Sequence, residues 1–190
     1  MRIAVDIDST LHHYWDLFEV AARRRYGVEL AYERQLTWRI PELEPDQLRA
    51  VVDDTHADEE ILSAQPYPGA VEALARWHGE GHWIHVTSHR RPRAHDATAA
   101  WLERIGLPYD DLHCSFDKLT RCRELGVGLL IDDSPVNLAG ARAAGIAGAT
   151  LVHPWNRELC ASGEVISAGD WPALARALEP TLAGRPGRGD

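Results

Sequence analysis

Acidic side chains follow two short apolar runs of the sequence, at positions where they could hold a metal ion. The first run leads into Asp6 and Asp8, and a later run ends at Asp132 and Asp133. In an open α/β sheet, ligands bind outside the carboxyl ends of the strands, so these carboxylates are expected to gather at one edge. They would repel one another without a cation, and an all-oxygen cluster suits Mg²⁺. The spacing therefore predicts a magnesium site.

Hydroxyl and amine groups accompany these carboxylates along the chain. Thr87 and Ser88 end another apolar run, with His89 directly after them, and Lys118 lies between this run and Asp132. Together with a cation, such groups can bind phosphate oxygens while one carboxylate is free to attack. Each motif alone is more often a turn, a helix cap or a solvated surface group. Their joint placement at the ends of successive predicted strands favours phosphate chemistry.

The elements that must position these groups are strands and helices in alternation. Short apolar runs predict buried parallel strands at residues 3–7, 83–87, 129–131 and 149–152, and a weaker one at 112–116. Helical patterns lie between them at residues 70–78, 94–105, 119–125 and 137–144. A glycine able to end a helix in the left-handed conformation follows each of these helices: Gly81, Gly106, Gly126 and Gly145. This alternation predicts an α/β fold with a doubly wound parallel sheet.

One stretch interrupts the alternation, between the first strand and the first crossover helix. It contains no convincing strand, only helical patterns at residues 14–26 and 45–54, and it is interpreted as a small helical insertion. The predicted division of the chain is a catalytic core formed by residues 1–11 and 66–182, the insertion at residues 12–65, and a disordered Gly/Pro-rich tail at residues 183–190.

Composition excludes several classes of protein. The 190 residues carry a net charge of -9, which argues against binding to the backbone of a nucleic-acid polymer. The three cysteines form no C-x-x-C pair, so a disulfide framework is not expected. The chain reaches Asp6 too early for a signal peptide, and no apolar run could span a bilayer. A cytoplasmic enzyme acting on a small anionic molecule remains compatible with these features.

In their order and spacing, the motifs resemble the four signatures of the haloacid dehalogenase (HAD) superfamily. The segment from Asp6 to Leu11 resembles the first signature, Thr87 the second, Lys118 the third, and Asp132 with Asp133 the fourth. Ser9 departs from the pattern, because many members have glycine there. The resemblance spans about residues 2–152 and implies a Rossmann-like core with a helical cap.

The resemblance also implies a role for each signature residue. Asp6 would be the nucleophile that forms an aspartyl-phosphate, and Asp8 the acid that protonates the leaving group and then the base that activates water. Thr87 and Lys118 would bind phosphoryl oxygens, with Lys118 also restraining Asp6, and Ser88 could share the phosphate. Mg²⁺ would be held by Asp133, Asp6 and the backbone carbonyl of Asp8, with Asp132 acting directly or through water.

Residues in and near the insertion have two readings each. Tyr14, Trp15 and Phe18 lie at helical spacing and are expected to form the core of the cap, whereas Trp38 in a polar stretch is the better candidate for stacking on a base. His12 and His13 either contact substrate or simply begin a helix, and they do not suit zinc because adjacent histidines do not share a helix face. His89, Arg90 and Arg91 either reach the substrate or belong to a solvated loop.

A narrower resemblance is to the cytosolic 5′(3′)-deoxyribonucleotidase-like branch, also called type C nucleotidases. It rests on the compact cap, on Thr87 with Ser88, and on the segment from Leu129 to Asn137. It implies a phosphomonoester hydrolase for a small phosphorylated metabolite, with a nucleoside monophosphate as one candidate and a homodimer as one candidate assembly. The alternatives are a phosphatase of another metabolite, a phosphotransferase, or a catalytically silent binding module. Dehalogenation is disfavoured because it would not need the fourth signature.

Overall fold

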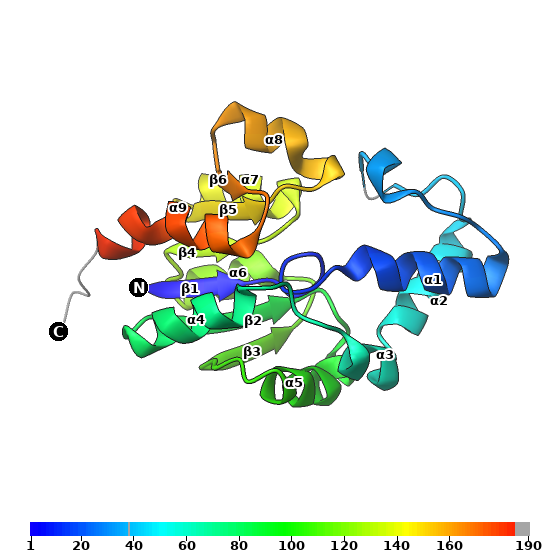
Figure 1. Cartoon of the computed structure of the whole chain (residues 1–190), viewed down its shortest axis with the longest axis horizontal. Coiled ribbons are helices and arrows are strands. Elements are labelled where there is room, and N and C mark those ends of the chain that lie inside the picture. Colours follow the sequence, from blue (N-terminus) through cyan, green and yellow to red (C-terminus); the bar gives the residue numbers. More distant parts are fainter. Residues whose placement is uncertain (38, 185–190) are drawn as a thin grey trace.

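The computed structural model describes residues 1–37 and 39–184, and within this part of the chain six strands form one parallel sheet. Its order is β3-β2-β1-β4-β5-β6 (Figure 1). The strands are β1 (Arg2–Val5), β2 (Trp83–Ser88), β3 (Asp111–Cys114), β4 (Leu129–Ile131), β5 (Ala147–Leu151) and β6 (Ile166–Ala168). Each neighbouring pair runs parallel. The predicted doubly wound α/β fold is therefore confirmed.

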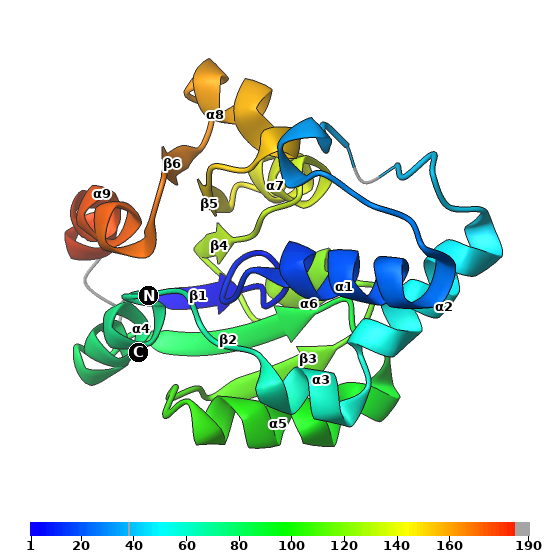
Figure 2. The same ribbon diagram turned by 45° about the vertical axis from the view of Figure 1, so that its right-hand side comes forward.

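Helices cover both faces of the sheet (Figures 1 and 2). One face carries α4 (Ala70–Gly79), α5 (His95–Arg104) and α9 (Trp171–Ala183), and the other carries α6 (Lys118–Glu124) and α7 (Pro135–Ala143). The side chains of β1 alternate between these layers, because successive residues of a strand point to opposite faces. Ile3 and Val5 pack in the larger core, whereas Ala4 packs in the smaller one.

Three tryptophans anchor the helices of the larger core. Trp77, Trp101 and Trp171 come from α4, α5 and α9, and each is at most 1% exposed. An aromatic side chain of this size buries a large apolar area, which stabilises the fold by roughly 25 cal/mol per Å² removed from water. These contacts fix the helices whose neighbouring loops reach the carboxyl edge of the sheet.

Most predicted elements are present, with shifted ends. The strand predicted at residues 3–7 ends at Val5, yet the backbone N–H of Asp6 still donates to the carbonyl of Ile131 at 2.9 Å. All four glycines expected to end helices have positive φ. The short edge strand β6 and helix α9 were not predicted, because β6 has only three half-buried residues and α9 carries Pro180 in its interior, which weakens a helical pattern.

Between β1 and α4 the chain forms a series of helices, and the bounds 12–65 of a separate insertion stay a prediction. This series, the insertion, contains α1 (Tyr14–Tyr26), η1 (Tyr32–Arg34), α2 (Pro45–Thr55) and α3 (Asp58–Ser63), and it stands beyond the carboxyl ends of the strands (Figure 1). Tyr14, Trp15 and Phe18 lie buried in its hydrophobic cluster, as expected, and Trp155 of the core joins the same cluster. The insertion therefore packs directly against the edge of the sheet where the acidic motifs lie.

Three remaining segments are short helices: η2 (Pro92–Ala94), η3 (Pro154–Asn156) and α8 (Arg157–Ser162). Helix α9 ends at Ala183, within the predicted tail. Residues 185–190 of that tail lie outside the described residues. Trp38, the residue predicted to stack on a base, also lies outside them. Cys114, Cys122 and Cys160 are free. Across residues 1–37 and 39–184, no helix is long and apolar enough to cross a membrane.

Candidate active site

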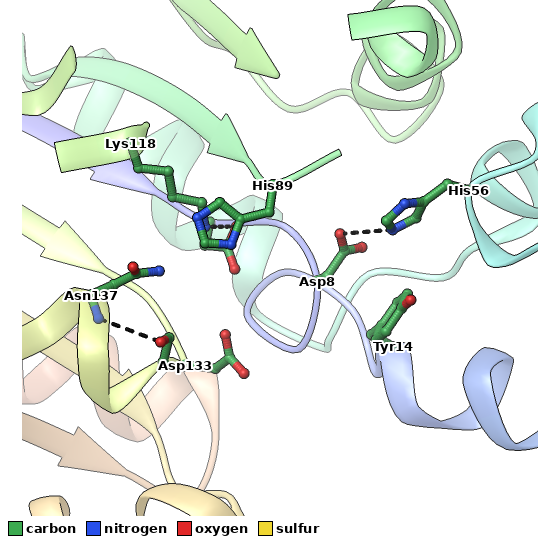
Figure 3. A pocket seen from close by; sticks show the side chains of 9 residues that line it. Asp8, Tyr14, His56, His89, Lys118, Asp133 and Asn137 are labelled. Carbon is green, nitrogen blue, oxygen red and sulfur yellow. Dashed lines mark hydrogen bonds and ion pairs between the residues drawn. The ribbon is translucent and has the colours of Figure 1, made fainter. Parts of the chain in front are cut away.

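The acidic motifs meet in a pocket at the carboxyl ends of β1 and β4. The strand order reverses between these two strands, which is where open α/β sheets bind their ligands. The pocket has a volume of about 210 Å³ (Figure 3). Its lining residues are Asp6, Asp8, Tyr14, His56, His89, Lys118, Asp133, Ser134 and Asn137.

Lys118 links two of the carboxylates. It is the first residue of α6, is 2% exposed, and donates from Nζ to Oδ1 of Asp6 at 2.5 Å and to Oδ2 of Asp132 at 3.1 Å. Burial alone would lower the pKa of this amine, but Asp132 and Asp6 outweigh that effect and raise it. It is also the only lysine in the sequence. A compact ammonium can reach two carboxylates from one point, whereas an arginine presents a planar fork.

Three buried carboxylates face a shared space. One oxygen from each of Asp6, Asp132 and Asp133 lies within 4.8 Å of the others. Burial raises the pKa of Asp6 to about 7, helped by Asp132 and Asp8 and opposed by Lys118. The pKa of Asp133 is also raised, first by burial and then by Asp132 and Asp6. One ammonium does not balance this much negative charge, and the oxygen-only donor set fits a hard divalent cation.

Side chains behind the cluster hold its members in place. Asp132 accepts from the backbone N–H of Ser134 at 2.9 Å and from Nδ2 of Asn137, which is 3.1 Å from each of its oxygens. Asp133 accepts from Nε1 of Trp155 at 3.0 Å. These roles of Asn137 and Trp155 were not predicted from the sequence. Asn137 lies one helical turn beyond Ser134, which caps α7 in the structure.

The turn after β1 is compact and partly strained. Its residue Ser9 has a φ of 61°, in the left-handed region that glycine adopts at little cost and other residues at about 1 kcal/mol. The backbone carbonyl of Ser9 accepts from Nε2 of His153 at 2.7 Å, and that of Thr10 accepts from Nε1 of Trp171 at 2.7 Å. These two hydrogen bonds support a serine where glycine would be the easier choice.

Asp8 is held apart from the three-carboxylate cluster. Its carboxylate accepts from Nε and Nη2 of Arg90 at 3.2 and 2.7 Å, and Nε2 of His12 lies 2.9 Å from Oδ1. In Figure 3 Asp8 points toward His56 of the insertion, 3.5 Å away, on the side of the pocket opposite Asp133. Burial would raise the pKa of Asp8, but Arg90, His12 and His56 outweigh it and hold the pKa well below its usual value.

The hydroxyl residues of the second motif occupy different places. Thr87 is fully buried and does not line the pocket, and its Oγ1 has no hydrogen-bond partner among the described residues. Ser88 does not line the pocket; its Oγ donates to Asp8 at 3.4 Å and accepts from the backbone N–H of Arg90 at 3.2 Å. His89 does line the pocket, stacked on Phe116 at 5.7 Å between ring centroids.

The other basic candidates lie outside the lining of the pocket. Arg90 and His12 are buried and contact Asp8 from outside the pocket lining. His13 packs against Tyr32, with 4.9 Å between the ring centroids. Arg91 pairs with Asp53 of the insertion at 3.5 Å. His56 and Tyr14, like Ser134 and Asn137, line the pocket without having been predicted as site residues. His56 follows α2 directly, and no local pattern links its imidazole to a site formed by strands far away in the sequence.

Comparison with known proteins assigns the chain to a family. Residues 1–171 match the family described as 5′ nucleotidase, deoxy (pyrimidine), cytosolic type C protein. The chain belongs to this family. It is therefore an HAD-type phosphatase of the nucleotidase class, which confirms the resemblance seen in the four signatures.

Individual relatives agree with this assignment. A Chlorobaculum tepidum protein, provisionally named a 5′(3′)-deoxyribonucleotidase, is 25% identical over 180 residues, which cover 89% of this chain and 85% of the relative. An HAD family hydrolase from Deinococcus radiodurans, solved with phosphate and sodium, has a TM-score of 0.67 at 16% identity, covering 95% and 96% of the two chains. A D,D-heptose 1,7-bisphosphate phosphatase from B. bronchiseptica, complexed with magnesium and phosphate, has a TM-score of 0.58 at 14% identity, covering 95% and 98%. The two structures show a shared fold.

The ion pair of Lys118 predicts a pH-dependent effect on stability. Lys118→Met should lower the free energy of unfolding by about 3 kcal/mol at pH 8 in metal-free buffer, because it leaves buried carboxylates without their cation. The loss should shrink at about pH 5, because Asp6, with a pKa of about 7, is then protonated and needs less compensation. Urea unfolding at both pH values measures this, with the exposed Arg123→Met as control. An equal loss at both pH values would contradict the electrostatic explanation.

Proposed function

We propose that this nucleotidase-family enzyme hydrolyses a nucleoside monophosphate, with Mg²⁺ as cofactor and an aspartyl-phosphate intermediate on Asp6. The observation that carries the proposal is the buried cluster of Asp6, Asp132 and Asp133 with Lys118 bonded to the nucleophile. Asp8 completes the set on the opposite side of the same pocket. A cytoplasmic location and a homodimer stay predictions.

The proposed reaction has two steps, formation and then hydrolysis of the aspartyl-phosphate. In the first, an oxygen of Asp6 attacks phosphorus, the bond from phosphorus to the ester oxygen breaks, and that oxygen takes a proton from Asp8. In the second, water attacks the aspartyl-phosphate, Asp8 takes the proton of the water, and phosphate leaves with Asp6 restored as a carboxylate. A phosphoryl dianion beside Asp8 favours its protonated form, which offsets the effect of Arg90 before the first step.

The ligands proposed for Mg²⁺ are Asp6, Asp133 and the backbone carbonyl of Asp8. Asp132 is proposed to act through water, because both its oxygens accept from Asn137 and it does not line the pocket. When bound, the ion would neutralise phosphoryl oxygens and the crowded carboxylates. Lys118 would hold Asp6 in line with the phosphorus, and Thr87 would donate its hydroxyl to a phosphoryl oxygen.

The charge of the pocket supports a substrate whose leaving group is neutral. Among the described residues that line it, Lys118 is the only lysine or arginine, and its ammonium already pairs with Asp6 and Asp132. The remaining wall includes the rings of Tyr14, His56 and His89, and burial lowers the pKa of His89 to about 4. Little cationic capacity is left for a second phosphate or a carboxylate. A nucleoside fits this wall, and base stacking by Trp38 stays a prediction.

The nucleophile provides the direct test of catalysis. Purified protein with Mg²⁺ should release phosphate from deoxynucleoside monophosphates, and Asp6→Asn should reduce the rate at least about 1,000-fold while the protein stays folded. Phosphate release and circular dichroism measure the two properties. Asp46→Asn, a change at an exposed carboxylate of α2, serves as control. Undiminished turnover by Asp6→Asn would overturn the mechanism, and absence of turnover on a broad phosphoester panel would favour a silent binding module.

The low positive charge of the pocket predicts an order of kcat/KM among phosphate esters. Deoxynucleoside 5′-monophosphates should have kcat/KM at least about tenfold above those of the matching 3′,5′-bisphosphates and of phosphoglycolate, because a second anion finds no free cation. Steady-state kinetics on this matched set decide the question. A preference for the 3′,5′-bisphosphates or for phosphoglycolate, which carry a second anionic group, would refute the proposed substrate class. The phosphatase mechanism would remain intact.

The raised pKa values predict how Mg²⁺ binding depends on pH. Asp6, with a pKa raised from 3.8 to about 7, and Asp133 bind protons in the folded metal-free protein that the unfolded chain releases. Metal-free stability should therefore fall as pH rises from about 4 to about 7, and Mg²⁺ must displace these protons to bind. The increase in Tm on adding Mg²⁺ should be larger at about pH 8 than at about pH 5.5. Asp133→Asn should lose most of this increase, and equal increases at both pH values would contradict the prediction.

A further inference from the structure

The strongest unassigned contact beside the pocket is the one between Asp8 and Arg90. Nε of Arg90 donates to Oδ2 of Asp8 at 3.2 Å, and Nη2 donates to Oδ1 at 2.7 Å, so each carboxylate oxygen receives one N–H of the same guanidinium. Such a two-point pair fixes both the distance and the plane of a carboxylate. Arg90 itself is 1% exposed and does not line the pocket, so its guanidinium faces Asp8 instead of a substrate.

The guanidinium is itself held from several sides by the core. Its Nη1 donates to Oγ1 of Thr98 on α5 at 3.2 Å, and its carbon lies 5.9 Å from the ring centroid of Trp101. The backbone N–H of Arg90 donates to Oγ of Ser88 at 3.2 Å. Arg90 therefore fixes the carboxylate of Asp8 relative to β2 and α5.

Other groups around Asp8 give weaker or less directional support. His12 contacts Oδ1 through one ring nitrogen at 2.9 Å, Ser88 lies 3.4 Å from Oδ2, and His56 of the insertion lies 3.5 Å from Oδ2. Each offers one contact, and any of them alone would let the carboxylate rotate. Only Arg90 contacts both oxygens with a permanent charge.

We propose that Arg90 is the positioning residue for Asp8. It holds the carboxyl group at the wall of the pocket, within reach of the ester oxygen that must receive a proton when the bond to phosphorus breaks. The inference rests on the proposed function, in which Asp8 supplies that proton. Arg90 touches neither substrate nor phosphate and acts only through Asp8.

The test compares two leaving groups that differ in their need for a proton. The nucleoside released from a deoxynucleoside 5′-monophosphate departs as a strongly basic alkoxide unless it is protonated. p-Nitrophenyl phosphate instead releases p-nitrophenolate, which is stable without a proton. Arg90→Gln should therefore lower kcat/KM for the nucleotide by about 100-fold and kcat/KM for p-nitrophenyl phosphate only about threefold, because kcat/KM reports the steps up to departure of the leaving group and not the later hydrolysis of the shared aspartyl-phosphate. Arg90→Lys should fall between, because an ammonium restores charge and one contact. Exposed Arg123→Gln is the matched control and should change neither rate.

A second set of variants separates failure of this inference from failure of the proposed function. Asp8→Asn should show the same split between leaving groups, and the double variant Asp8→Asn/Arg90→Gln should lose nothing further for the nucleotide. A split for Asp8→Asn without one for Arg90→Gln overturns the role of Arg90 alone. No split for Asp8→Asn overturns the proton transfer itself and with it this inference. An equal fall of kcat/KM for both substrates in Arg90→Gln would show a merely structural role.

Thr98→Val keeps the test decisive if Arg90→Gln does not fold. This variant is nearly isosteric and leaves the charge balance unchanged, but it removes the hydroxyl that fixes Nη1 of Arg90. We expect the same split, reduced to about fivefold, with an unchanged circular dichroism spectrum. A crystal structure of Arg90→Lys adds a direct measurement: Asp8 should turn from its present place, and an unmoved carboxylate would overturn the proposal.

Discussion

Buried negative charge at the ends of β1 and β4 is the constraint on which the site depends. Asp6, Asp132 and Asp133 bring oxygens within 4.8 Å of one another in a region nearly closed to solvent. Carboxylates this close repel strongly at low dielectric, so the arrangement needs positive charge within reach. Lys118 supplies part of it through one compact ammonium that bonds two of the three. The residual charge explains why a divalent cation fits this chain, and why the free protein binds protons instead.

The fold meets this constraint by joining distant parts of the chain at one edge of the sheet. The turn after β1 carries both Asp6 and Asp8, and its backbone is held by His153 and Trp171, which lie 144 and 161 residues beyond their partners in that turn. Such long-range hydrogen bonds keep Ser9 in a conformation that its side chain disfavours. The geometry of Asp6, the proposed nucleophile, therefore depends on the C-terminal third of the core as well as on the first strand.

The sequence predicted the groups whose placement follows from strand ends, and little else of the site. Asp6 and Asp133 could be placed together because parallel strands share a carboxyl edge, and Lys118 followed from the HAD signatures. His56 could not, because its position depends on how the insertion packs on the core through cross-chain contacts such as those of Trp155. Strand β6 was missed for a related reason: three half-buried residues carry too little apolar pattern, and pairing with β5 determines the strand.

In the proposed mechanism Asp8 faces two opposite demands, and its surroundings are compatible with both. Arg90 and His12 stabilise the carboxylate, the form that accepts a proton from water, whereas a phosphoryl dianion in the pocket would favour the acid. The contacts also differ in origin, because Arg90 is fixed by α5 while His56 belongs to the insertion. A shift of the insertion would therefore alter the contact with His56 and leave the pair with Arg90 intact. Since His56 and Tyr14 also line the pocket, the segment expected to contact the leaving group is the one that can adjust the residue proposed to protonate it.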